Sequence, residues 1–187
     1  VPTVSHSRRS HPDRDQHHVI NHLDGSEMNE TRNIRVESAR IARGNVIATA
    51  EVSVDDFDAL FLPGGFGAAK NFCSFAFEGA NASIEADIQH LIQSFHNANK
   101  PIGAVCIAPA VLALCLGKGT LTIGSDPATA EALEKLGATH TVCPVTEMVI
   151  DLEHNLVTAP AYMEDAPIHQ VAEGIEKAVN AVLSLCT

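Results

Sequence analysis

The sequence predicts a doubly wound α/β domain, in which helices cover both faces of a mostly parallel sheet. Short apolar runs typical of buried strands alternate with segments whose apolar residues recur at helical spacing. This alternation favours a parallel sheet, because each crossover returns the chain to the same end of it. Two predicted strands run into loops of unusual chemistry, Pro63-Gly64-Gly65 and Val105-Cys106-Ile107. Ligands bind such sheets beyond the carboxyl ends of the strands, so we expect the site at these loops.

The first third of the chain carries few expected elements. Residues 1–18 are polar and aperiodic, and we expect no stable element there except a short strand at Val1–Val4. A helix is expected from about Ile34 to Arg43, with Gly44 at the position that ends it. The apolar run Phe57–Leu62 then predicts a buried strand leading into the glycine loop.

The rest of the chain alternates regularly between strands and helices. A helix with an apolar face from Ile84 to Phe95 is expected to end before Pro101, and another to begin after Asp126, a good N-cap residue. The other expected elements are strands at Ile102–Cys106, Leu121–Gly124, Thr141–Val145, Met148–Asp151 and Leu156–Ala159, and helices at Ile107–Leu114 and about Pro167–Leu185.

Composition narrows the classes of partner. The 187 residues carry a formal net charge of −11, and no lysine or arginine cluster lies beyond Arg43, which argues against nucleic acid as a partner. No apolar run reaches the length that crosses a bilayer. Five cysteines without a CxxC pair favour a reducing, cytoplasmic location over a disulfide framework. No metal-ligand spacing is convincing, and His17, His18 and His22 are better interpreted as surface histidines.

Cys106 is the candidate reactive residue. It follows four apolar residues and precedes a helix start, as a residue on a nucleophile elbow does. Amide groups and the dipole at a helix N-terminus favour the thiolate, which is the nucleophilic form of cysteine. The alternative is a buried small hydrophobic residue, a common role of cysteine.

The glycine loop supplies the context for this cysteine. Glycines after a strand let backbone N–H groups point into a cleft, so the N–H groups of Gly65 and Ile107 are the candidate oxyanion donors and Gly64 is a candidate binding residue. The alternative is that the double glycine only forms a tight turn between a strand and a helix. Phe66 is included in this candidate binding loop. Lys70 would hold an anionic substrate group or favour the thiolate, unless it is a solvated surface lysine.

Several segments resemble a known family, the enhancing-lycopene-biosynthesis (ElbB/ES1) proteins of the DJ-1/PfpI, class I glutamine amidotransferase-like superfamily. The similarity runs from about residue 12 to the C-terminus. Its most specific motifs are PGGFGAAKN at Pro63–Asn71 and CIAP at Cys106–Pro109, supported by ETRN at Glu30–Asn33 and TAPAYM at Thr158–Met163.

The resemblance implies a flavodoxin-like fold, a homodimer, and a weak glyoxalase-type activity that converts glyoxal to glycolate without glutathione, metal or another cofactor. Cys106 would be the nucleophile, with Gly65 and Ile107 as oxyanion donors. Vertebrate relatives are mitochondrial, and the family carries a link to isoprenoid biosynthesis.

The sequence departs from the family pattern at two places. Residues 1–11 do not resemble the family's first strand, the following loop with its glutamate, or the next helix and strand. We therefore expect residues 1–18 to be an irregular segment and residues 19–187 to form the DJ-1/PfpI-like domain. We expect a sheet without the family's first strand to expose apolar edges. Gly124-Ser125-Asp126 stands where the superfamily has a histidine. The acid/base partner of Cys106 is therefore not identified.

Three functions are weighed on this basis. The first is glyoxalase chemistry on a small aldehyde through the Cys106 thiolate. The second is a redox-sensing or regulatory protein with an oxidisable cysteine and little turnover. The third is an ammonia-delivering amidotransferase subunit, which ranks last because no strand-end His-x-Glu motif completes a triad.

Overall fold

A computed structural model describes residues 7–186, so the strand expected at Val1–Val4 lies outside the described part. The chain divides into two compact units, Val1–Ser53 and Val54–Thr187. No helix within residues 7–186 has the length and apolar character that a membrane span requires.

The first unit contains one helix and a pair of short parallel strands. Strand β1 (Arg9–His11) pairs with β2 (Val46–Ala48). Helix α1 (Ile34–Ala42) begins after Asn33, whose side chain accepts the Val36 N–H, and ends at Arg43 and Gly44, both at positive φ. The expectation of no element at residues 5–18 was thus wrong for β1. Its polar residues pair through the backbone and show no apolar alternation that would reveal a strand.

The second unit is built on a four-stranded sheet in the order β3-β4-β8-β7. Strands β3 (Leu60–Leu62), β4 (Ile102–Val105) and β8 (Leu156–Ala159) are parallel, whereas β7 (Val149–Asp151) runs antiparallel to β8. Every residue of β4 and β8 is buried, which is why both strands appear in the sequence as nearly continuous apolar runs.

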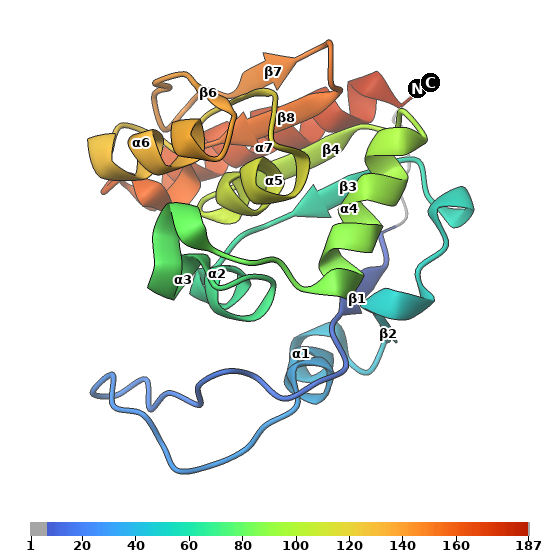
Figure 1. The fold of residues 1–187 in the computed structure, drawn as a ribbon, viewed down its shortest axis with the longest axis vertical. Helices are drawn as coiled ribbons and strands as arrows, with labels where there is room; N and C mark the ends of the chain where they lie inside the picture. The colour runs from blue at the N-terminus through green and yellow to red at the C-terminus, as the bar shows by residue number, and fades with distance from the viewer. Residues whose placement is uncertain (1–6, 187) are drawn as a thin grey trace. The chain divides into compact units, whose positions relative to one another are not determined.

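Helices cover both faces of this sheet (Figure 1). Helix α7 (Ile168–Leu185) packs against β4 and β8 on one face, and α4 (Ala86–Asn97) and α5 (Ala108–Leu116) cover the other. The two sides are tightly filled: a Cβ added to Gly103 would lie 2.4 Å from the Phe61 ring and 2.8 Å from Val182. The predicted α/β class, mostly parallel with interleaved helices, is confirmed.

Two expected strands are shorter or absent. Strand β5 is limited to Thr120–Leu121 and pairs with β6 (Thr139–His140), and residues 141–145 form no strand. The Thr141 N–H makes a last hydrogen bond to the Leu121 carbonyl, at 2.9 Å, before Pro144, which has no N–H to donate. The Thr122 N–H donates instead to the Thr158 side chain, so the ladder of β5 stops early.

The remaining elements connect the sheet. Asp126 caps a helix as expected, because its carboxylate accepts the Thr129 N–H at 2.8 Å. This helix is α6 (Pro127–Lys135). The sequence did not indicate the two short helices after the glycine loop, α2 (Phe66–Asn71) and α3 (Phe75–Glu78). The described residues also form the 3₁₀ helices η1 (Thr49–Glu51), η2 (Val54–Asp56), η3 (Gly79–Asn81) and η4 (Ala161–Met163).

Candidate functional site

Cys106 sits on a sharp turn between β4 and α5. Its φ of 60° lies in the left-handed region, which costs a residue with a Cβ roughly 1–2 kcal/mol relative to right-handed backbone. The Cys106 N–H donates to the Ala159 carbonyl of β8 at 3.1 Å, and α5 begins two residues later with Ile107 as its N-cap. This is the geometry of a nucleophile elbow, in which local strain holds a side chain at the sheet's edge.

The Cys106 thiol differs from the other four in its contacts. It is half-buried, and its Sγ makes no hydrogen bond with any residue in the range 7–186. Each of the other thiols donates to a backbone carbonyl. Those pairs are Cys73 to Ala68 and Ala69, Cys115 to Gln89, Cys143 to Pro144, and Cys186 to Asp58 and Val182.

Burial also makes those four thiols harder to ionise. Desolvation raises the pKa of Cys115 to about 11. It is also the main reason that the pKa values of Cys73, Cys143 and Cys186 are raised. None of these cysteines is therefore a good candidate for a thiolate nucleophile at neutral pH.

The glycine loop lies directly against the elbow. A Cβ added to Gly64 would lie 2.5 Å from the Val105 carbonyl oxygen and 2.8 Å from the Cys106 Cβ, so only glycine permits this approach. Its φ of 83° also favours glycine. Gly64 therefore acts as a packing surface for the elbow, whereas the Cβ position of Gly65 faces open space.

Two backbone donors lie near the thiol's base. Among the turn, loop and cap hydrogen bonds of residues 7–186, none is donated by the N–H of Gly65 or of Ile107. The Ile107 nitrogen lies 3.5 Å from the Cβ position of Gly64, which ties this amide to the glycine loop. The structure thus brings Gly64, Cys106 and Ile107 together.

Phe66 and Lys70 lie on α2, just beyond the glycine loop. The Phe66 side chain is 65% exposed, and the Lys70 Nζ lies 4.8 Å from the centroid of its ring. This is cation–π geometry, so Lys70 is ordered against Phe66 on the surface of α2.

The segment Gly124-Ser125-Asp126, which lacks a histidine, makes a hydrogen bond to a carboxylate instead. Ser125 donates its N–H to the Oε1 of Glu164 at 2.6 Å, while Asp126 serves as the cap of α6. Glu164 follows β8 and η4, and sequence analysis missed it. Its only signal is a carboxylate directly after the TAPAYM motif at a strand's carboxyl end.

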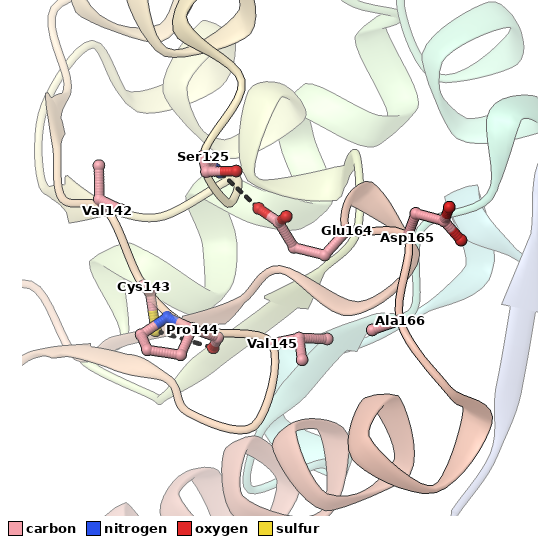
Figure 2. Close-up of a pocket in the computed structure, with 8 residues that line it drawn as sticks. All are labelled: Ser125, Val142, Cys143, Pro144, Val145, Glu164, Asp165 and Ala166. Carbon is pink, nitrogen blue, oxygen red and sulfur yellow. Dashed lines mark hydrogen bonds between the residues drawn. The ribbon is translucent and has the colours of Figure 1, made fainter.

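Glu164 borders a pocket of about 370 Å³ (Figure 2). Its lining residues are Ser125, Val142, Cys143, Pro144, Val145, Glu164, Asp165 and Ala166. Cys106 is not among them. Within residues 7–186, no three His, Cys, Asp or Glu side chains are grouped so as to hold a metal ion.

Comparison with known proteins agrees with this architecture. The DJ-1/PfpI family profile matches residues 22–167. The mitochondrial ES1 protein homolog of Rattus norvegicus is 40% identical over 184 residues, covering 93% of this chain and 69% of the relative. The human glutamine amidotransferase-like class 1 domain-containing protein 3, also mitochondrial, has the same identity and coverage.

A solved structure shows the same fold over nearly the whole chain. The isoprenoid biosynthesis protein with amidotransferase-like domain from Ehrlichia chaffeensis superposes with a TM-score of 0.89 at 36% identity. The match covers 96% of this chain and 83% of that protein. With the family profile, the ES1 relatives and the elbow in agreement, the chain belongs to the DJ-1/PfpI family, among the relatives of the ES1 proteins.

Proposed function

We propose that the chain is a cofactor-independent, glyoxalase-type enzyme that converts glyoxal to glycolate with Cys106 as its nucleophile. The observation that carries this proposal is the elbow itself. It holds one half-buried thiol at φ 60°, without a hydrogen bond to another described residue, beside two amides that make no turn, loop or cap bond. A thiol in this setting is positioned for attack on a carbonyl carbon.

The reaction balances without an external oxidant. The Cys106 thiolate adds to one aldehyde carbon of glyoxal, and the resulting alkoxide takes a proton to give a hemithioacetal. That carbon then loses its C–H proton, a proton is delivered to the neighbouring carbon, and a thioester of glycolate forms. One carbon is oxidised as the other is reduced. Water cleaves the thioester, which releases glycolate and restores the thiol.

The backbone groups around the elbow have separate roles in this scheme. The N–H groups of Gly65 and Ile107 would donate to the developing alkoxide, where each such donor is worth roughly a hundredfold or more in rate. Gly64 allows the two loops to approach, because any side chain there would collide with the elbow. Phe66 and Lys70 would border the entrance from α2.

Replacing the nucleophile tests the proposal. Glycolate formation from glyoxal should fall by more than about 100-fold in Cys106→Ser, because a serine hydroxyl at this site has no base to activate it. Cys115→Ser should retain activity, since the raised pKa of about 11 keeps that thiol protonated. Equal turnover by Cys106→Ser and the unaltered protein would remove Cys106 from the mechanism.

A second function is favoured by one specific observation. The proton transfer above needs an acid/base group, yet no described side chain hydrogen-bonds to the Cys106 Sγ. A thiol without such a partner suits a redox sensor that is oxidised to sulfenic and then sulfinic acid. Mass spectrometry after mild peroxide decides between the two. Oxygen added selectively at Cys106, with negligible aldehyde turnover, would favour the sensor.

The wider setting is proposed from the family resemblance and from the cysteine content. We infer a homodimer in a reducing compartment such as the cytoplasm, which the five free cysteines suit. The name of the Ehrlichia chaffeensis protein suggests a link to isoprenoid biosynthesis. Light scattering on the purified protein reports the oligomeric state directly.

A further inference from the structure

The pocket beside Glu164 lies at the same edge of the sheet as Cys106. Thr120 donates its N–H to Asp151, which pairs with the first residue of β8, and Thr122 donates to Thr158 further along β8. The segment from Thr120 therefore runs in the same direction as β8. Ser125 must lie near the carboxyl end of β8, where the Ala159 carbonyl accepts the Cys106 N–H.

The pocket and the elbow also share their apolar support. Val145 and Ala166, which line the pocket, pack against the same buried cluster as Cys106 does. That cluster contains Ala159 and Ala161, the residues that lead from β8 toward Glu164. The pocket and the elbow therefore rest on one apolar cluster near the carboxyl end of β8.

Glu164 gives this pocket its polar character. Its Oε1 is held by the Ser125 N–H at 2.6 Å, and a Cβ on Gly124 would lie 2.5 Å from the same oxygen. The glycine thus permits the carboxylate to reach across to Ser125. Figure 2 shows Glu164 pointing toward Ser125, while the carboxylate of Asp165 points away from it. The other neighbours of Glu164 in the pocket include apolar Val142, Pro144 and Val145.

We propose that this pocket is a charge-selecting subsite, which takes the unreacting end of a neutral or cationic substrate bearing hydroxyl or ammonium donors. Glu164 would accept a hydrogen bond from that end and turn anionic compounds away. The pocket, at about 370 Å³, has room for the unreacting end of a substrate larger than glyoxal. The aldehyde part of this assignment rests on the proposed function, whereas the charge selection does not.

The two ends of such a substrate would meet different groups. The carbonyl would face the amides of Gly65 and Ile107, on the side of α2 and α5. The donor-bearing end would face Glu164, on the side of β8. Lys70 lies on α2, where its Nζ is 4.8 Å from the centroid of the Phe66 ring.

Two thiol reagents of opposite charge test the selection without any turnover. Aminoethyl and sulfonatoethyl methanethiosulfonate each form a mixed disulfide with Cys106 and release methanesulfinate. Peptide mass spectrometry assigns the modified cysteine. The unaltered protein should react faster with the cationic reagent at low ionic strength. Glu164→Gln should lower the cation-to-anion rate ratio by about threefold or more, because one nearby charge is lost.

Glu153→Gln is the matched control. Glu153 is exposed in the turn between β7 and β8, at the opposite edge of the sheet, so its loss changes the net charge equally without touching the pocket. The ratio should stay unchanged in this variant. Equal ratios in Glu164→Gln and Glu153→Gln, with native circular dichroism in both, would overturn the inference.

Substrate kinetics separate this inference from the proposed function. For 3-hydroxy-2-oxopropanal, Glu164→Gln should raise KM several-fold while kcat changes little, and KM for glyoxal should stay the same. If the unaltered protein turns over neither aldehyde but the reagent ratio shifts as expected, the glyoxalase proposal fails and the subsite stands. If turnover is present and neither KM nor the ratio responds to Glu164→Gln, only the subsite fails.

Discussion

Cys106 is set apart by the backbone that carries it. The other cysteines occupy buried or helix-packed positions, where desolvation raises each pKa and a carbonyl accepts the S–H. Cys106 instead occupies a turn whose φ of 60° is strained for a residue with a Cβ. The strain is tolerated because neighbouring strands fix the turn, through the Ala159 carbonyl on one side and the glycine loop on the other.

This contrast predicts selective alkylation. With limiting iodoacetamide at pH 8, Cys106 should be modified at least about tenfold faster than any other cysteine. Cys115 should be the slowest, because at a pKa of about 11 only roughly one thiol in a thousand is ionised at that pH. Time-resolved peptide mass spectrometry gives the order. Modification of Cys186 as fast as Cys106 would show that the elbow confers no special reactivity.

At the scale of elements, the sequence predicts best where periodicity is strong. The helices α4 and α7 and the strands β4 and β8 carry long apolar patterns that tertiary packing then uses directly. Strands β1 and β6 escaped prediction because two or three polar residues pair only through their backbone. Helix α2 escaped because Phe66–Asn71 begins with a glycine-rich motif that resembles a loop.

The features of the candidate site also differ in how well the sequence predicts them. That Cys106 and the glycine loop lie together was predictable, because each lies at the end of an apolar strand and parallel strands end together. Glu164 was not, because its partner Ser125 is 39 residues away and the contact joins two loops without periodic pattern. The packing role of Gly64 also emerges only from the 2.5 Å approach to the Val105 carbonyl oxygen.

Contacts between α4 and the turn that joins β7 to β8 are expected to make the free energy of unfolding depend on pH. Asp151 pairs with His154 at 2.9 Å, and the His154 ring stacks on His96 with centroids 6.1 Å apart. Desolvation, then the charges of Lys118 and His154, lower the pKa of His96 in the folded protein. Burial favours a higher pKa for Asp151, but hydrogen bonds from the Thr120 amide and from His154 lower it overall.

We therefore expect stability to fall in mild acid. Because the folded-state pKa of His96 lies below 6.5, the unfolded chain binds more protons as the pH drops below that value. The free energy of unfolding should fall between about pH 6.5 and the folded pKa, by at most about 1.4 kcal/mol per pH unit for this one proton. Asp151 adds a further loss only below about pH 4.

Urea unfolding at pH 7.5 and 5.5 measures this effect. His96→Gln should reduce the loss between the two pH values, because the variant no longer has that group to protonate. His90→Gln, which removes an exposed imidazole from the same helix, should leave the loss unchanged. An equal pH dependence in His96→Gln and the unaltered protein would refute the assignment.

On the scale of the whole molecule, charge is distributed unequally between the two units. Seven arginines offset seven carboxylates up to Ser53. From Val54 onward, 16 acidic residues face five lysines, so the second unit carries the entire formal charge of −11. Some carboxylates are paired, as Glu147 and Glu173 are with Lys177, but exposed pairs contribute little. Most of the excess charge therefore repels itself across the second unit.

This repulsion predicts that salt stabilises the protein at alkaline pH. Raising NaCl from about 20 to about 300 mM at pH 8 shortens the screening length to well below 10 Å. The melting temperature should then rise by about 2–4 °C for each 1 kcal/mol of repulsion removed. Near pH 5.2, the isoelectric point expected from the composition, the same salt change should have little effect because the repulsion has vanished. A melting temperature that falls with NaCl at pH 8 would mean that the ion pairs, such as Lys177 with Glu147, outweigh the repulsion.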